Sequence, residues 1–189
     1  MDISKNNFSK LLGLVSKHND WMDETINLIA SENRLSVNIN EVLKSDFGNR
    51  VAEGWLGERV FPGIKYYDEI ENYGMELVRN VFRADFADIR PISGTMANMI
   101  VFNAFTVPGD TIASISISSG AHISMAGSTP KKVFNLNVIE LPFDNIGFNI
   151  RVKESIEVLK KFKPKMLVLG GSVLLFAQPL RELAPICKD

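Results

Sequence analysis

The chain has 189 residues, of which 46% are hydrophobic, 9% aromatic and 23% charged. These values are typical of a globular protein of one domain, and they exclude disordered, collagen-like and disulfide-rich classes. With 21 basic and 22 acidic residues, the net charge is -1, which indicates neither a nucleic-acid partner nor an acidic membrane surface. A single cysteine, Cys187, excludes an internal disulfide and fits a reducing cytosol, so we expect a cytoplasmic protein.

No targeting segment and no membrane span is visible in the sequence. The first ten residues lack the apolar run of a signal peptide. The longest apolar stretch, residues 166–177, has about 12 residues, whereas a membrane helix needs about 20. Because this stretch is interrupted at residues 170–172, it predicts a buried strand that leaves through a glycine turn.

The first 50 residues predict a helical arm. Apolar residues at helical spacing run from Phe8 to Val15, and further apolar residues follow from Trp21 to Ile29. Ser36 is the expected N-cap of the next helix. Such an arm has too little apolar area to form its own core, so we expect it to pack on another body, such as a second subunit.

Residues 50–66 predict an irregular loop, because Gly54, Gly57, Pro62 and Gly63 disfavour a helix. Loops of this length inside a compact domain are often functional.

From Tyr67 onward, helix and strand patterns alternate. The expected elements are a helix from residue 67 to 81, a strand at 87–92, a helix at 94–106, strands at 111–117 and 133–141, a helix at 154–162 and a strand at 166–169. This alternation predicts an α/β fold with a mostly parallel sheet covered by helices.

Three segments follow predicted strands, where ligands bind in open parallel sheets. The first, Ser93-Gly94-Thr95, also opens a helix, so its backbone N–H groups and two hydroxyls could hold a phosphate. For an isolated segment of this kind, simple capping of the helix by Ser93 is the commoner interpretation.

The second segment is Gly120-Ala121-His122, and the third is Gly170-Gly171-Ser172. His122 could stack on a planar ligand or exchange protons, or it could be structural; His18, the other histidine, is expected on the arm surface. Glycines at 170–171 would let a ligand approach, with Ser172 as a hydrogen-bond donor, although a simple turn is an equal alternative. Together the three segments indicate a phosphate-bearing cofactor along one edge of the sheet.

Glu32 and Glu53 are the acid/base candidates, because each lies in or beside a non-helical segment rich in small residues. Taken alone, either is more simply explained as a solvated surface carboxylate. The two histidines and one cysteine do not form the pattern of a zinc site, so no metal is expected.

Leu28-Ile29-Ala30-Ser31-Glu32-Asn33 resembles the opening signature of serine hydroxymethyltransferase, the pyridoxal-phosphate enzyme of one-carbon metabolism. Matching segments follow in the family's order: Ala52-Glu53-Gly54, Gly57-Glu58-Arg59, residues 63–68, Ser93-Gly94-Thr95-Met96-Ala97-Asn98, Pro108-Gly109-Asp110, Gly120-Ala121-His122, Lys163-Pro164-Lys165 and Gly171-Ser172. Residues 50–55 and 89–94 look most like the archaeal branch, whose one-carbon carrier is often a modified pterin.

The resemblance implies a fold-type I transferase that interconverts serine and glycine and passes the hydroxymethyl carbon to a tetrahydropterin, of tetrahydrofolate or tetrahydromethanopterin type. Residues 1–50 would be the helical arm and residues 51–189 the first half of the cofactor-binding large domain. The family is expected to act as a homodimer with shared active sites.

The resemblance also implies roles for individual residues. The cofactor phosphate would be held by Ser93, Gly94 and Thr95, with His122 stacked on the pyridine ring and Ser172 near the phenolic oxygen. Ser31 would help hold the substrate carboxylate. Glu53 would be the acid/base group at the hydroxymethyl carbon, reaching the site from the neighbouring subunit.

The sequence departs from the common family pattern at three tyrosine positions, which are Val51, Val60 and Phe61 here. No phenol is left at them, although Phe61 can supply a ring wall beside the substrate.

The family's cofactor-nitrogen aspartate, its Schiff-base lysine and its substrate-binding arginine would all follow Asp189. No histidine occurs after His122, and Lys188 matches no lysine motif of the family. We therefore expect that these residues alone form no covalent link to the cofactor and do not catalyse the reaction. The sequence then represents the N-terminal part of the enzyme or, alternatively, a non-catalytic partner that dimerises with a full-length one. A threonine aldolase is disfavoured by residues 29–33.

Overall fold

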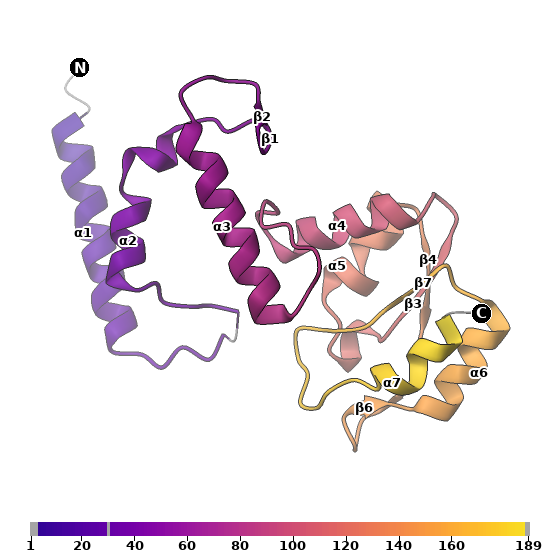
Figure 1. The fold of residues 1–189 in the computed structure, drawn as a ribbon. Coiled ribbons are helices and arrows are strands. Elements are labelled where there is room, and N and C mark those ends of the chain that lie inside the picture. The colour runs from indigo at the N-terminus through magenta and orange to yellow at the C-terminus, as the bar shows by residue number, and fades with distance from the viewer. Residues whose placement is uncertain (1–3, 30, 188–189) are drawn as a thin grey trace. The chain divides into compact units, whose positions relative to one another are not determined.

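The computed structural model describes residues 4–29 and 31–187 (Figure 1). Ala30 and Lys188, which the sequence interpretation used, lie outside the described residues. Backbone contacts divide the chain into two units, one up to Asn72 and one from Tyr73 onward. Each unit is described by itself.

The first unit contains short elements joined by extended chain. They are α1 (Ser4–Asp23), α2 (Val37–Leu43), the 3-10 helix η1 (Asp46–Asn49), β1 (Gly54–Trp55), β2 (Glu58–Arg59) and the start of α3 (Lys65–Phe82). The Ser36 cap is confirmed, because its Oγ accepts the Ile39 N–H at 3.4 Å. The helical prediction is wrong for residues 24–29, where the Asn27 side chain accepts the Ile29 N–H at 2.8 Å and so competes with helical bonding.

The expected irregular loop at residues 50–66 contains a β-hairpin, which the sequence did not predict. Strands β1 and β2 pair antiparallel, with Gly54 opposite Arg59 and Trp55 opposite Glu58. Gly54 has a φ of 106°, and a Cβ there would lie 2.4 Å from the Glu58 carbonyl oxygen. Only glycine allows this approach of the two strands.

The second unit is the α/β part of the molecule. Its helices are α4 (Gly94–Phe105), α5 (Ile123–Ala126), α6 (Val152–Phe162) and α7 (Leu180–Leu183), with η2 (Ile117–Ser119), the π-helix η3 (Thr129–Val133) and η4 (Ala184–Cys187). Its strands are β3 (Thr111–Ser114), β4 (Asn137–Glu140), β5 (Phe143–Asp144), β6 (Asn149–Ile150) and β7 (Met166–Val168). The order β4-β3-β7 is parallel throughout, and β5 pairs antiparallel with β6. The α/β prediction is confirmed.

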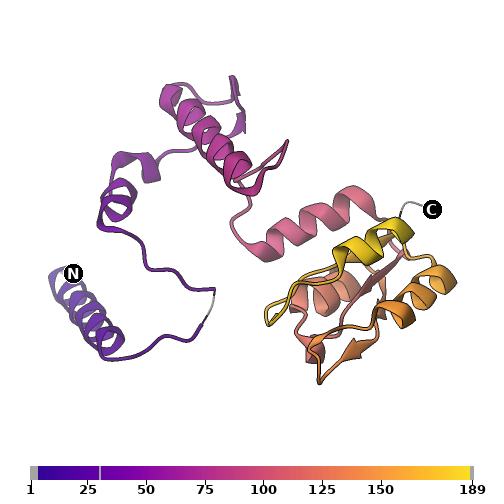
Figure 2. The ribbon, with the colours of Figure 1, turned by 60° about the horizontal axis from the view of Figure 1, so that its bottom comes forward.

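The central strand β3 forms the core. Ile112 packs in a cluster with Phe102 of α4, while Ala113 packs with Leu159 of α6 and Leu183 of α7. Successive side chains of a strand point to opposite faces, so helices cover both sides of the sheet. Figure 2 shows α4 on one side of the strands and α6 on the other.

The predicted strand at residues 87–92 is wrong. No strand forms there, because the Asp88 carboxylate accepts the Arg90 N–H at 3.0 Å and Pro91 has no N–H to give. These Arg90 bonds also lower the pKa of Asp88 to about 2. Three other strands are shorter than predicted: β3 ends at Ser114, β7 ends at Val168, and η3 occupies the expected start of β4. No helix within the described part of the chain is long and apolar enough to span a bilayer.

Candidate functional site

The first predicted segment forms the N-terminus of α4. Ser93 is extended and caps the helix, since its Oγ accepts the Met96 N–H at 3.1 Å. The N–H groups of Gly94 and Thr95 precede the first intrahelical bond, and a Cβ on Gly94 would meet nothing within 4 Å. The Ser93 hydroxyl keeps its proton for a further acceptor. Two free amides, a helix dipole and open space make this end of α4 suited to an anion.

His122 is the N-cap of the short helix α5. Its Nδ1 accepts the Ser124 N–H at 3.2 Å and lies 2.7 Å from the Ser124 Oγ. A backbone N–H can only donate, so Nδ1 carries a lone pair and the imidazole proton of the neutral ring is on Nε2. The Ser124 Oγ accepts in turn from the Asn98 amide at 2.8 Å, and Ser124 is fully buried. Asn98 thus links α4, through Ser124, to the His122 ring.

The second and third predicted segments contact each other directly. The Gly120 carbonyl accepts the N–H groups of Ser172 at 2.8 Å and Val173 at 3.3 Å. A Cβ on Gly171 would lie 2.4 Å from the Gly120 oxygen, and a Cβ on Gly120 would lie 2.3 Å from the Val173 oxygen. These glycines therefore permit a close approach of two backbones. Both sequence interpretations of Gly171, a simple turn and access for a ligand, overlooked this contact.

The second unit thus connects all three segments. Backbone bonds join residues 120 and 172, and the Asn98–Ser124–His122 side chains join α4 to the His122 segment. The third segment does follow a strand, since β7 ends at Val168, but the first does not, because no strand forms at residues 87–92. The side chains of Ser93, His122 and Ser172 are exposed. Their assigned roles remain predictions.

The remaining predicted residues belong to the first unit. Ser31, Glu53 and Phe61 are all exposed. The Glu53 carbonyl accepts the Val60 N–H at 3.0 Å, and the Glu32 carboxylate accepts from the Asn27 amide. Glu32 also lines a cavity of about 600 Å³ beside the C-terminal end of α1. The structure therefore brings none of the three proposed substrate residues into contact with another.

Sequence reasoning assigned no role to a cluster around Arg59. The Arg59 guanidinium forms ion pairs with Asp68 at 2.7 Å and Glu71 at 2.6 Å, and its side chain is only 8% exposed. Glu71 and Asp68 raise the pKa of Arg59, while the Gly57 N–H and Arg59 lower the pKa of Asp68. The spacing of the two carboxylates on one face of α3 was the available signal.

The described residues contain no group of three histidine, cysteine, aspartate or glutamate side chains able to hold a metal ion.

The chain is similar in sequence to one known protein family over most of its length. The sequence model of the family described as "Serine hydroxymethyltransferase" matches residues 5–188. A serine hydroxymethyltransferase of Korarchaeum cryptofilum is 44% identical over 96% of this chain and 44% of its own length. Those of Pyrococcus abyssi and Cenarchaeum symbiosum are each 42% identical, over 95% and 98% of this chain. The chain spans less than half the length of these relatives.

Proposed function

Because the chain belongs to the serine hydroxymethyltransferase family, we propose that its protein interconverts serine and glycine with pyridoxal 5'-phosphate as cofactor and a tetrahydropterin as one-carbon carrier. The observation that carries this proposal is the connection of the α4 N-terminus to His122 and to Ser172 within one unit. A phosphate-bearing planar cofactor needs an anion site for its phosphate and a contact for its ring, at a fixed distance from each other. Hydrogen bonds between the segments would keep that distance fixed.

The residues present fit the phosphate group. Gly94 leaves open space at the helix start, its N–H and that of Thr95 are free of intrahelical partners, and Ser93 retains a hydroxyl donor. We assign the phosphate to these three residues. His122 would face the pyridine ring with Nδ1 anchored, and Ser172 would donate toward the phenolic oxygen. When bound, the cofactor supplies an electron sink for the bond that breaks at the amino acid's α-carbon.

The substrate contacts come from the first unit. Ser31 would help hold the carboxylate, Phe61 would supply an apolar wall, and Glu53 would move a proton at the hydroxymethyl oxygen. We propose that Glu53 reaches the site of a neighbouring subunit in a homodimer. Its exposure supports this, as does the apolar stripe of α1 from Phe8 to Val15, which is between 47% and 60% exposed. Large exposed apolar surfaces mark interaction sites.

Not all of the chemistry resides in these residues. The family resemblance assigns the covalent lysine and the partner of the pyridine nitrogen to sequence beyond Asp189, and the chain spans 42–44% of its relatives' length. We therefore propose that residues 1–189 hold the phosphate and the ring but form no covalent cofactor link by themselves. The proposed one-carbon carrier is tetrahydrofolate or a tetrahydromethanopterin-type pterin.

The test uses the intact protein that carries this sequence. Serine-dependent glycine formation is measured with tetrahydrofolate and with tetrahydromethanopterin, which separates the two carriers. Glu53→Gln should lower kcat by about 10²–10⁴-fold, the usual contribution of a positioned acid/base group. Gly94→Ala should weaken cofactor binding while leaving the unfolding midpoint unchanged or higher, because alanine favours helices.

Glu58→Gln is the matched control for Glu53→Gln, since Glu58 is an exposed carboxylate on the neighbouring strand of the same hairpin. Absence of glycine formation with either carrier would contradict the proposed activity. Equal loss of turnover in both glutamate variants would remove Glu53 from the acid/base role.

A further inference from the structure

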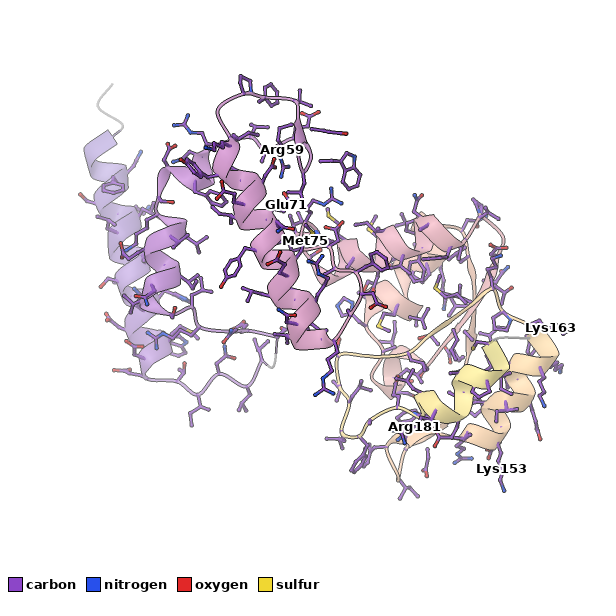
Figure 3. All side chains as sticks on the ribbon, viewed as in Figure 1. Arg59, Glu71, Met75, Lys153, Lys163 and Arg181 are labelled. Atoms are coloured by element: carbon purple, nitrogen blue, oxygen red, sulfur yellow. The ribbon has the colours of Figure 1, made fainter. Side chains whose placement is uncertain are left out.

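Arg59 is the most enclosed charged side chain near the proposed acid/base residue. It lies at the end of β2, its side chain is 8% exposed, and four hydrogen bonds reach its guanidinium group. Figure 3 shows Arg59 and Glu71 together beside α3. An arginine of this kind fixes the positions of whatever its planar fork contacts, because the five N–H directions are rigid.

On one side, the guanidinium holds the backbone around Glu53. The Arg59 Nη1 donates to the carbonyl oxygens of Ala52 and Gly54, each at 2.8 Å. The Glu53 carbonyl itself accepts the Val60 N–H at 3.0 Å. Three successive carbonyl groups, centred on Glu53, are therefore bound by two adjacent residues of the same strand end.

On the other side, the guanidinium is fixed to α3. Its Nε donates to Asp68 at 2.7 Å and its Nη2 to Glu71 at 2.6 Å. The second Asp68 oxygen accepts the Gly57 N–H at 2.9 Å, which ties the hairpin turn to the same helix. Charge-assisted bonds to two carboxylates are among the stronger hydrogen bonds in proteins.

The Glu53 side chain has no such support of its own. Across the described part of the chain, no hydrogen bond and no ion pair reaches its carboxylate, and the residue is exposed. The backbone therefore sets the direction of the Glu53 Cα–Cβ bond, from which the carboxylate extends. That backbone is held by Arg59.

We propose that Arg59 is a positioning residue for Glu53, joining the Ala52–Gly54 backbone to Asp68 and Glu71 so that the Cα–Cβ bond of Glu53 keeps one direction. This inference rests on the proposed function, in which Glu53 moves a proton on the substrate. A lysine at this position carries one ammonium group on a flexible stem and cannot bond two carbonyls and two carboxylates at once.

The first measurement needs no catalysis. In the intact protein without substrate, the hydrogen exchange of the Val60 amide is compared between parent and Arg59→Lys. Loss of the bonds on either side of Glu53 should raise that exchange rate by about tenfold or more. Arg50→Lys is the matched control, because Arg50 makes a bidentate pair with Asp46 in the same unit but is 57% exposed.

The second measurement is kinetic and uses the cofactor-loaded protein. Arg59→Lys should lower kcat for serine by about 100-fold, the effect of a small misplacement of a reacting group, with less than about twofold change in cofactor affinity. The cofactor site assigned above lies wholly in the second unit, so its affinity should not follow Arg59. Free guanidinium added to Arg59→Ala should restore part of the lost kcat.

Unchanged Val60 exchange in Arg59→Lys would overturn the clamp itself. Faster exchange with kcat within about twofold of the parent would show that Arg59 only stabilises the hairpin, and would overturn the positioning role. Absence of serine turnover in the parent protein would instead remove the proposed function on which the inference rests, and the exchange result would still decide whether the clamp exists.

Discussion

The two units of this chain are stabilised by different forces. In the second, β3 is buried between two layers of helices, with Ile112, Ala113 and Ser114 at 0% exposure. Among the described residues up to Asn72, Ile64 is the one buried apolar side chain. That unit relies instead on the Arg59 ion pairs and on the stacked rings of Phe47 and Tyr67, whose centroids are 4.2 Å apart.

A hydrophobic core and a polar cluster hold functional residues in place in different ways. A hydrophobic core holds its neighbours through many small contacts, so it suits a cofactor cradle that must stay constant. A polar cluster fixes a few backbone atoms without burying the surface around them. In the role proposed for Arg59, the first unit holds the backbone at Glu53 while its apolar side chains stay exposed.

The largest expected effect tests the core of the second unit. Phe102→Ala removes a side chain that is 1% exposed and should destabilise that unit by about 3–5 kcal/mol, from lost burial and the cavity left behind. The measurement is hydrogen exchange of the β3 amides. Phe105→Ala, on the same helix but 62% exposed, should change it by less than about 1 kcal/mol. Trp21 and Trp55 both lie in the first unit. If Phe102→Ala also changed the tryptophan emission, the two units would not be stabilised separately.

A smaller loss of stability is expected for a substitution at Gly171, where two backbone segments are in contact. Gly171→Ala places a Cβ 2.4 Å from the Gly120 oxygen, and neither atom belongs to a flexible side chain. We expect a loss of about 1–3 kcal/mol in urea unfolding, together with weaker cofactor binding. Gly94→Ala, where the new Cβ meets nothing within 4 Å, is the control for stability. Equal stability of the two variants would show that the 120–172 contact contributes nothing.

Removing the Ser124 hydroxyl, which bonds Asn98 and His122, should lower the free energy of unfolding by about 1–2 kcal/mol. Ser124→Ala leaves the half-buried Asn98 amide without its acceptor and removes one partner of His122 Nδ1. In the parent protein at neutral pH, ¹⁵N spectra of His122 should show the proton on Nε2. Ser124→Ala keeps the backbone N–H that donates to Nδ1, so the variant should show the same tautomer. Its loss of stability is measured by urea unfolding against Ser118→Ala, at an exposed serine. A parent spectrum with the proton on Nδ1 would contradict the assigned hydrogen bonds.

The smallest change in stability is expected when the first unit is acidified. The Gly57 N–H and Arg59 lower the pKa of Asp68 below its ordinary 3.8, so the unfolded chain binds this proton more tightly than the folded unit. The stabilisation by ionised Asp68 is therefore complete well above pH 3.8 and is lost as the pH falls through that value toward the folded pKa. The emission of Trp55 follows the unfolding of this unit at each pH, in a Trp21→Phe variant that removes the other tryptophan. Asp68→Asn should remove this pH dependence, and its persistence there would assign the effect to another group.

Much of the second unit was predictable because its signals are local. The α4 start at Gly94, the Ser93 cap and the β7 strand each depend on residues within a few positions. The failure at residues 87–92 is also physical: the apolar pattern suits a strand, but Asp88 takes the Arg90 N–H that a neighbouring strand would need. The hairpin at Gly54 was hidden because its glycines indicate a turn without indicating that the flanking residues pair.

By itself, the sequence determined the α/β class, the family and the candidate residues, because caps, strand patterns and contiguous motifs are written in neighbouring positions. Only the tertiary structure decided which of these residues support one another. Asn98 and Ser124 are 26 positions apart, and Gly120 and Ser172 are farther still. Arg59 likewise joins a hairpin to α3. Such contacts arise only when folding brings distant backbone segments within hydrogen-bond distance, and no local pattern records that distance.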